Sequence, residues 1–421
     1  MIAKVKRIPA DVALFESLGA IYLISGLPNV LVELFPPYRY MLGLLFLTLV
    51  LYPISAFLPR LARLKIVLVL GAILLIAILP TCIFMKLRWE TDPYRFAHDG
   101  LIQSEAATRF VLEGKNPYVE NYRETPMALW PYADGINPAL DHYPYLPATF
   151  LFPALFQGWS ERSLGWFDHR ILYLSSYAGL LILAYRLTDS YTRRITLLIA
   201  IGLNPLFTYF LIQGRNDVLV LFWLAVVIEC LRTRHRNLSA VFMAIACSTK
   251  QLAWFFIPFY FVFLGGSGSG RERLRRAQKP FVLFAITLGL FILPWFIANP
   301  SAFIEDTLAF QSGLLPDSYP ISGVGLGTLL LNYGFLPDKD AYFPFSFLQF
   351  LFGAPVAIGL LRRQLFWNSL RSAVIGYAVV LSIVLFFARA FNVNYLGYLL
   401  NVIVIGWVGL SSIGPSEESI P

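Results

Sequence analysis

Apolar runs about as long as a membrane-spanning helix recur along nearly the whole chain. A helix that crosses the hydrocarbon core of a bilayer needs about 20 consecutive apolar residues. The sequence therefore predicts an all-α membrane protein with a bundle of about 10–12 transmembrane helices. We expect spans near 13–36, 40–58, 65–87, 169–187, 195–212, 215–231, 279–298, 342–360, 371–388 and 394–411.

The composition excludes a water-soluble protein. Hydrophobic residues make up 57% of the chain and charged residues only 14%, whereas soluble domains contain about 25% charged residues. The net charge of +8 does not indicate nucleic-acid binding, because no basic stretch has the aromatic or glycine-rich interleaving of an RNA reader. The three cysteines lie inside apolar runs without metal-binding spacing, so we interpret them as small hydrophobic residues.

Basic residues fall in short clusters between the apolar runs. Cytoplasmic loops of membrane proteins carry an excess of Lys and Arg, and one path through the bilayer places every cluster in the cytoplasm. That path predicts a multi-pass protein of the cell membrane with both termini cytoplasmic and segment 88–168 outside. The clusters are Lys4, Lys6 and Arg7; Arg60, Arg63 and Lys65; Arg186, Arg193 and Arg194; Arg232, Arg234 and Arg236; Arg271, Arg273, Arg275, Arg276 and Lys279; and Arg362, Arg363 and Arg371.

This path divides the chain into four parts. We expect an N-terminal three-span segment at 1–87, an extracytoplasmic loop with interfacial helices at 88–168, a transmembrane bundle at 169–411 and a disordered tail at 412–421. Within the loop, the short apolar stretch 146–158 is interrupted by prolines, so we expect it to be interfacial or re-entrant.

Residues 237–265 lie between two basic clusters but are too few for two full spans. We expect a V-shaped pair of short helices with Thr249, Lys250 and Gln251 at the apex. Polar backbone at membrane depth is tolerated where it lines a water-filled cavity, so the apex should reach a polar cavity.

Further polar residues gather on the expected outer side of the membrane. Charged groups at or within a membrane are costly and suggest a functional site. Lys250 needs either a partner, for which Asp217 is available, or a ligand. Arg215 and Asp217 could also belong to a solvated hairpin turn. The set continues with Asn216, Arg389, Asn392 and Asn394.

The long loop contains a run that predicts an amphipathic helix on the membrane surface. The run begins at Asp99, continues through Glu105, and can end at Gly114, because glycine favours the helix C-cap and Pro117 prevents continuation. An aspartate at the membrane rim could act as a base. It could equally be a simple N-cap, a position that favours aspartate.

Four motifs in order resemble the GT-C superfamily of integral membrane glycosyltransferases. Asp99 stands fifteen residues before Gly114-Lys115-Asn116-Pro117-Tyr118, and Tyr143-Pro144-Tyr145-Leu146-Pro147 follows. Asn216-Asp217 and Thr249-Lys250-Gln251 come later. The pattern is most similar to the polyprenol-phosphate-mannose-dependent α-1,2-mannosyltransferase-like family. The chain departs from it in having three spans before the loop, and in lacking an Asp-x-Asp pair.

The resemblance implies a GT-C-like fold and an inverting hexosyltransferase that moves a sugar, most simply mannose, from a polyprenyl-phosphate donor. The acceptor would be an extracytoplasmic hydroxyl of a lipid-linked or other glycan, and membrane lipids would be the other partners. No cofactor or obligate metal is expected. The implied roles are Asp99 as base, with Asp92 and Glu105 as alternatives; Lys250, Arg215 and Arg389 as donor phosphate ligands; and Asp217, Asn216, His142, Tyr118 and Gln251 as substrate-binding residues.

Two other classes of protein compete with this interpretation. A transporter or flippase for a lipid-linked or small polar substrate would favour inverted repeats with a site at the membrane midplane, and the sequence shows no such repeat. A non-catalytic membrane scaffold would have no need of a lysine at membrane depth.

Overall fold

A computed structural model describes residues 8–58, 62–133, 135 and 137–410, and the described part is mostly helical, with two strands of two residues each. Lys4, Lys6, Arg7, Arg60 and the predicted tail 412–421 lie outside the described residues. The first helices are α1 (Ala10–Ile24), α2 (Leu27–Leu34), α3 (Tyr38–Phe57) and α4 (Ala62–Ile73), which continues through η2 (Leu74–Ile78) into α5 (Leu79–Glu90).

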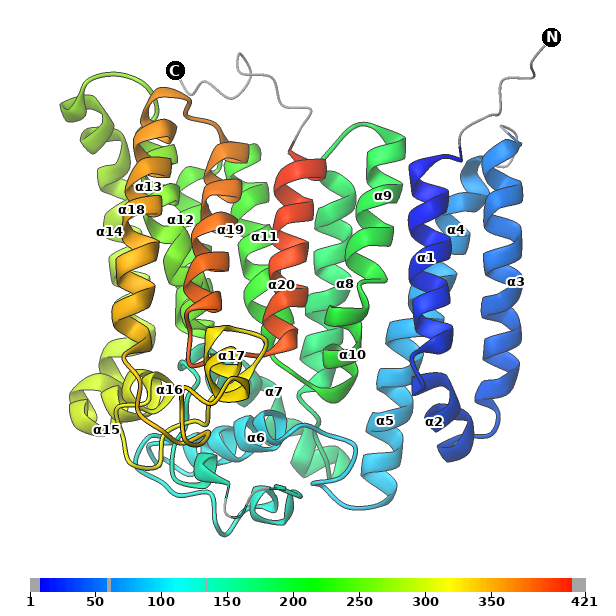
Figure 1. The fold of residues 1–421 in the computed structure, drawn as a ribbon, viewed down its shortest axis with the longest axis horizontal. Coiled ribbons are helices and arrows are strands. Elements are labelled where there is room, and N and C mark those ends of the chain that lie inside the picture. Colours follow the sequence, from blue (N-terminus) through cyan, green and yellow to red (C-terminus); the bar gives the residue numbers. More distant parts are fainter. Residues whose placement is uncertain (1–7, 59–61, 134, 136, 411–421) are drawn as a thin grey trace.

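The described residues of segment 88–168 form a compact layer across one end of the bundle (Figure 1). It contains α6 (Asp99–Leu112), η3 (Pro126–Leu129), η4 (Pro138–Leu140) and α7 (Ala148–Leu164).

The remaining chain supplies most of the bundle and a second set of outer segments. Its elements are α8 (Arg170–Arg186), α9 (Tyr191–Gly202), α10 (Pro205–Gln213), α11 (Asp217–Arg232), α12 (Arg236–Thr249), η5 (Gln251–Phe256), α13 (Ile257–Gly265), α14 (Gly270–Ala298), α15 (Pro300–Ile304), η6 (Glu305–Ala309), α16 (Phe310–Ser312), β1 (Ser322–Gly323), α17 (Leu326–Asn332), α18 (Phe345–Phe366), α19 (Leu370–Phe386), β2 (Ala390–Phe391), α20 (Val393–Val404) and η7 (Ile405–Gly409).

The described residues contain four helices long and apolar enough to cross a membrane, or six if each bent pair counts as one span. The bends, 54° between α1 and α2 and 48° between α9 and α10, coincide with Gly26 in the left-handed region and with Pro205 at the start of α10. The expected 10–12 spans exceed this number, because several bundle helices such as α11 and α19 have only 16 or 17 residues.

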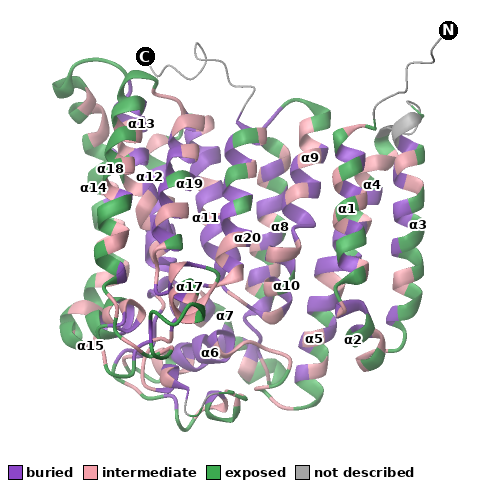
Figure 2. Cartoon of the chain, in the orientation of Figure 1, coloured by how far each residue is buried: buried purple, intermediate pink, exposed green. Residues whose placement is uncertain are grey.

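The bundle has two chemically different ends. The start of α4 and the junctions α8–α9, α11–α12, α13–α14 and α18–α19 carry the described basic residues of the clusters, and they lie at the end opposite α6 and α7 (Figure 1). Buried residues fill the centre, while α14 and α18 present exposed faces (Figure 2). Only 6% of the most apolar stretch of α14 and 11% of that of α18 is buried, which is the pattern of helices that face lipid.

The expected V-shaped pair is present, but the expected surface helix is not. Helix α12 ends at Thr249, the 3-10 helix η5 begins at Gln251, and Lys250 is the extended residue between them. Helix α6 starts within one residue of the predicted position, because His98 rather than Asp99 is its N-cap, and Gly114 follows its end at φ +77°. However, α6 is buried from Gly100 to Thr108, because α7, the stretch predicted to be interfacial, packs along it.

Candidate active site

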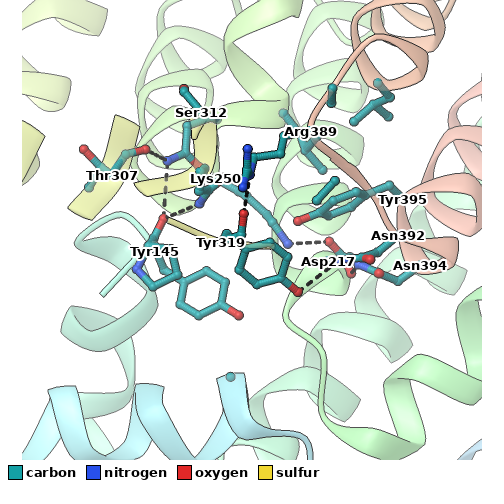
Figure 3. Close-up of a pocket in the computed structure, with 18 of the residues that line it drawn as sticks. Tyr145, Asp217, Lys250, Thr307, Ser312, Tyr319, Arg389, Asn392, Asn394 and Tyr395 are labelled. Atoms are coloured by element: carbon teal, nitrogen blue, oxygen red, sulfur yellow. Dashed lines mark hydrogen bonds and ion pairs between the residues drawn. The ribbon is translucent and has the colours of Figure 1, made fainter. Parts of the chain in front are cut away.

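A cavity of about 310 Å³ lies where the outer layer meets the bundle. It is enclosed by the start of α6, the start of α11, the apex between α12 and η5, the η6–α16 segment, and the β2–α20 junction (Figure 3). Its polar lining includes His98, Asp99, Gln103, Tyr145, Arg215, Asn216, Asp217, Lys250, Gln251, Gln311, Ser312, Tyr319, Arg389, Asn392, Asn394 and Tyr395.

Asp99 lies at the first position of α6 and faces this cavity. Its Oδ1 accepts from the Gly100 N–H at 2.6 Å and lies 2.7 Å from His98 Nδ1, and its Oδ2 accepts from Asn137 Nδ2 at 3.2 Å. Gly100 N is also 3.1 Å from His98 Nδ1. However, His98 Nδ1 must carry a proton to lie so close to the Asp99 carboxylate, and a protonated nitrogen cannot accept a hydrogen bond. We therefore assign the Gly100 bond to Asp99.

These contacts keep Asp99 ionised. Burial by itself would raise the pKa of Asp99, but the His98 ring, the Asn137 amide and the Gly100 N–H outweigh it and lower the pKa to about 2. The helix N-terminus adds donor groups on the same side. Asp99 is therefore a carboxylate at any physiological pH, with one face open to the cavity.

Lys250 is the buried cation at the apex of the helical pair. Its Nζ donates to Asp217 Oδ1 at 2.6 Å and to Asn216 Oδ1 at 3.0 Å, and it lies 4.8 Å from the ring centre of Tyr395. The sequence offered Asp217 as a possible ion-pair partner of Lys250, and in this structure the two residues are bonded (Figure 3). An ammonium group has three N–H donors, so one is left over from these two bonds.

Arg215 and Asn394 complete this arrangement, which we call the Lys250 cluster (Arg215, Asn216, Asp217, Lys250 and Asn394). Asn394 Nδ2 donates to Asp217 Oδ2 at 2.6 Å, and Asn394 Oδ1 accepts from Arg215 Nη1 at 2.8 Å. Arg215 Nε is buried and has no hydrogen-bond partner within the described residues. Arg215 lines the cavity, and the guanidinium makes one hydrogen bond to a described residue, from Nη1 to Asn394.

Arg389 also lines the cavity, but backbone carbonyls engage its guanidinium. Nε donates to Tyr319 O, and the two Nη groups donate to the carbonyls of Lys339, Asp340 and Ala341. Arg389 thereby ties two outer segments to the β2 strand, which pairs in parallel with β1. In this arrangement it offers few donors to a phosphate, in contrast to the role implied by the family resemblance.

The other expected substrate-binding residues are not all at the cavity. Gln251 lines it and donates to Thr307 O at 2.9 Å. Tyr118 is buried behind the wall, with its hydroxyl donating to Tyr145 O. His142 is not in the lining, and its two ring nitrogens lie 2.8 Å from Asp306 Oδ1 and 3.0 Å from Asp317 Oδ2. Tyr118 and His142 therefore support the wall rather than face the space inside.

The two alternative bases also lie away from the cavity. Asp92 has a 44% exposed side chain and pairs with Arg95 at 3.0 Å. Glu105 is buried, where it receives two hydrogen bonds from Arg88 at 2.9 and 2.7 Å and one from the backbone of His169. Of the three candidates only Asp99 faces the cavity.

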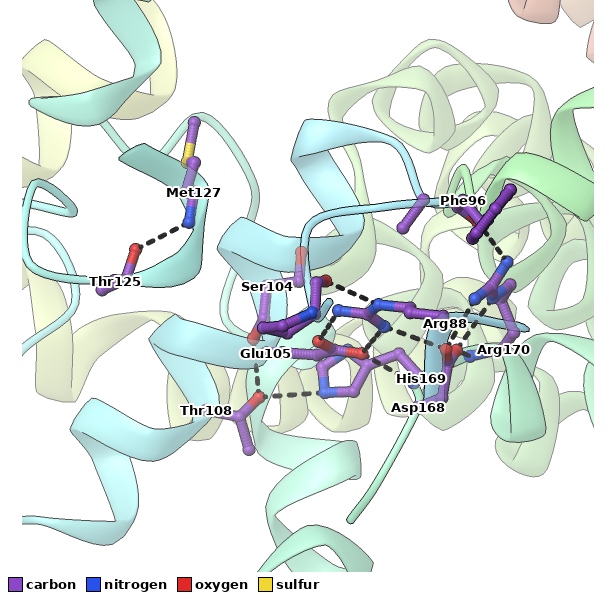
Figure 4. Close-up of polar contacts among 12 residues, drawn as sticks. Arg88, Phe96, Ser104, Glu105, Thr108, Thr125, Met127, Asp168, His169 and Arg170 are labelled. Atoms are coloured by element: carbon purple, nitrogen blue, oxygen red, sulfur yellow. Dashed lines mark hydrogen bonds and ion pairs between the residues drawn. The ribbon is translucent and has the colours of Figure 1, made fainter. Parts of the chain in front are cut away.

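Glu105 belongs to a buried set of charges that the sequence did not reveal, the Arg88 network (Arg88, Glu105, Asp168 and Arg170) (Figure 4). Arg88 also donates to Asp168 at 2.9 Å, and Arg170 forks onto both oxygens of Asp168 at 2.9 and 2.7 Å. Arg170 further donates to the carbonyls of Phe96 and Ile212. The network fixes α6, and with it Asp99, to the ends of α5 and α8.

Sequence reasoning also gave no role in the site to several cavity residues. They include His98 and Asn137, which hold Asp99, and the aromatic residues Tyr145, Tyr319 and Tyr395. His98 directly precedes Asp99, so its proximity could have been foreseen. Asn137 lies 38 residues further along the chain, and no local pattern connects the two.

The arrangement can hold a polar ligand between an ionised carboxylate and a cationic wall. Tyrosine rings and amide side chains between them suit a ligand with several hydroxyl groups. In the described part of the chain, no three His, Cys, Asp or Glu side chains are grouped so as to hold a metal ion; the expected independence from metal stays a prediction.

Comparison with known proteins gives one result. The model of glycosyltransferase family 87 matches residues 143–408. The matched region includes the Lys250 cluster but begins after Asp99 and α6. No curated protein and no solved structure matches the chain.

Proposed function

Since the chain belongs to glycosyltransferase family 87, a family of membrane glycosyltransferases of the GT-C type, we propose that it transfers a hexose from a polyprenyl phosphate to an acceptor hydroxyl with inversion. Mannose is the sugar that we propose. The observation that carries the proposal is that one cavity is lined both by an ionised carboxylate, Asp99, and by a cationic cluster around Lys250.

In the proposed reaction, the acceptor oxygen attacks the anomeric carbon from the face opposite the phosphate. The new C–O bond forms as the bond between the anomeric carbon and the phosphate oxygen breaks, and the acceptor proton passes to Asp99. A carboxylate with a pKa of about 2 is a weak base toward a free alcohol. It becomes an adequate acceptor as the attacking oxygen gains positive charge, so proton transfer follows bond formation.

The leaving polyprenyl phosphate gains negative charge, which preorganised cations stabilise. Arg215 and Lys250 carry two positive charges, and Asp217 carries one negative charge, so the three together are left with +1. A sugar phosphodiester brings one negative charge before reaction. A nucleotide sugar or a polyprenyl-diphosphate sugar would bring two, so the charge balance favours the monophosphate donor.

The apolar part of the cavity supports a lipid donor. Beside the Lys250 cluster the lining becomes hydrophobic and extends along η5, α18 and α19, through Leu252, Phe255, Phe345, Val384 and Leu385. Helix α18 is largely exposed on its outer side. A polyprenyl chain attached to a phosphate at Arg215 could follow this surface toward the lipid.

We further propose that the cavity opens on the extracytoplasmic side and that both termini are cytoplasmic. The described basic clusters lie at the end of the bundle opposite the cavity, and the positive-inside rule assigns that end to the cytoplasm. The acceptor would then be a lipid-linked or other glycan outside the cell membrane.

The test is a transfer assay with purified protein in nanodiscs. Labelled polyprenyl-phosphate hexoses are compared with the matching polyprenyl-diphosphate and nucleotide sugars, using a panel of glycan acceptors. We expect transfer from the monophosphate donor alone, and an anomeric configuration in the product opposite to that in the donor, as read by NMR. Transfer from a nucleotide sugar, or retention of configuration, would refute the proposal.

A further inference from the structure

Asn394 occupies an unusual position in the Lys250 cluster, between a cation and an anion. Its amide oxygen accepts from Arg215 and its amide nitrogen donates to Asp217. An arginine can only donate and a carboxylate can only accept, so these neighbours fix the orientation of the amide. The residue is 3% exposed, and the contact with Asp217, at 2.6 Å, is short.

This arrangement distributes the charges unequally. Asp217 accepts from Lys250 at Oδ1 and from Asn394 at Oδ2, and among the described residues its ion pair is with Lys250 and not with Arg215. The Arg215 guanidinium donates a hydrogen bond to the neutral amide oxygen of Asn394, and its central carbon lies 4.8 Å from the ring centre of Phe210. Its buried Nε has no partner in the described chain.

We infer that Asn394 is a positioning residue that keeps Arg215 available for the anionic group of the donor. The Asn394 amide bridges Arg215 and Asp217 and thereby keeps them from forming a direct ion pair, which would consume the guanidinium. Arg215 is then the principal phosphate ligand, and Lys250 chiefly holds Asp217. This inference rests on the proposed function, which named both cations without ranking them.

The inference predicts an effect that depends on which substrate is varied. In Asn394→Leu, a side chain of similar size leaves Asp217 Oδ2 unpaired, and Arg215 can turn to pair with it. We expect the KM for the polyprenyl-phosphate donor to rise at least about tenfold, since a hydrogen bond to a charged group is worth that much or more. The KM for the acceptor should remain within about twofold.

A second substitution distinguishes positioning from a loss of folding. Adding Asp217→Asn to Asn394→Leu removes the carboxylate that captures Arg215, so the donor KM should return toward its original value. The matched control is Asn401→Leu. Asn401 is fully buried on the same helix α20 and accepts from Asn204 at 2.9 Å, but it does not line the cavity. It should lower the melting temperature without changing either KM.

The outcomes separate the inference from the proposed function. Thermal stabilisation by polyprenyl phosphate alone is measured first with the unmodified protein. If no stabilisation and no transfer occur, the proposed function fails. If both occur but Asn394→Leu leaves the donor KM unchanged, or raises both KM values equally without recovery by Asp217→Asn, the positioning role is overturned. If Asn394→Leu does not fold, Asn394→Asp is used, which pairs Arg215 directly and should raise the donor KM in the same way.

Discussion

Replacement of Asp99 by asparagine separates the chemistry of the cavity from its fold. Asparagine has nearly the same shape and keeps one oxygen that can accept from the Gly100 N–H and from the Nδ1–H of His98, but it cannot take a proton. Loss of a positioned general base typically slows a reaction by about 10²–10⁴-fold. We therefore expect the Asp99→Asn variant to insert and fold while its transfer rate falls by that factor.

The structure limits the cost in stability. The pKa of Asp99 is about 2, against an ordinary value of 3.8, which corresponds to roughly 2 to 3 kcal/mol of favourable interaction with the ionised form. Because the folded pKa is the lower one, this stabilisation is present above about pH 4 and is lost as the pH falls through about 2. At neutral pH the variant should lose at most that amount, since part of the hydrogen bonding remains.

The assay measures initial transfer rates and melting temperatures for the unmodified protein, Asp99→Asn and Asp92→Asn. Asp92 is the matched control because it is a half-exposed carboxylate of the same segment whose ion pair among the described residues is with Arg95. A rate for Asp99→Asn within about threefold of the unmodified protein would refute the base assignment. If Asp92→Asn were inactive while Asp99→Asn remained active, the base would be Asp92, which would contradict the geometry of the cavity.

Three further predictions concern topology, the apex lysine and pH. A cysteine introduced at Lys115 should react with an impermeant maleimide from outside the cell, and one at Ser267 should not; the reverse pattern would invert the membrane orientation. Lys250→Met should lower the melting temperature by orphaning Asp217, at a cost of about 3–5 kcal/mol, and Asp217→Asn should recover much of that stability; no recovery would mean that the buried pair contributes little. Burial opposes protonation of His142, but its two aspartate partners raise the pKa of the ring. The contribution of protonated His142 to stability is therefore complete below the ordinary histidine pKa of 6.5 and is lost as the pH rises through the pKa in the folded protein. His142→Gln should flatten the pH dependence of the melting temperature in that range, and an unchanged curve would refute the assignment.

Local sequence signals predicted the parts of the site that depend on local chemistry. The position of α6 to within one residue and the glycine after its end follow from local preferences, which act within one turn of a helix. The N-cap residue is His98 and not Asp99. The apex at Lys250 follows from a segment too short for two spans. These features needed no knowledge of which helices are neighbours.

Contacts between distant segments were not predictable in this way. Arg88 and Asp168 are separated by 80 residues, and an arginine at the end of a span fits the common pattern of an interfacial residue just as well. The burial of α6 was missed because its sequence is amphipathic. In the structure α7 packs along α6, and Glu105 is bonded to Arg88 of α5. For Arg389, the sequence showed a charge at the outer rim but not the four carbonyls that enclose it.

The charge balance of the buried groups gives a physical reason why the cavity should hold an anion. The Arg88 network contains two arginines and two carboxylates, so its charges cancel, and its donors also meet backbone carbonyls. The Lys250 cluster contains two cations and one carboxylate. An uncompensated buried cation is strongly destabilising, and removing one partner of a buried pair costs about 3–5 kcal/mol. The Arg88 network, which supports the site, is therefore balanced in charge, whereas the Lys250 cluster leaves one positive charge at the cavity wall. The protein is most stable when an anion occupies the cavity. Binding of the donor phosphate would therefore both orient the sugar toward Asp99 and complete the electrostatics of the fold.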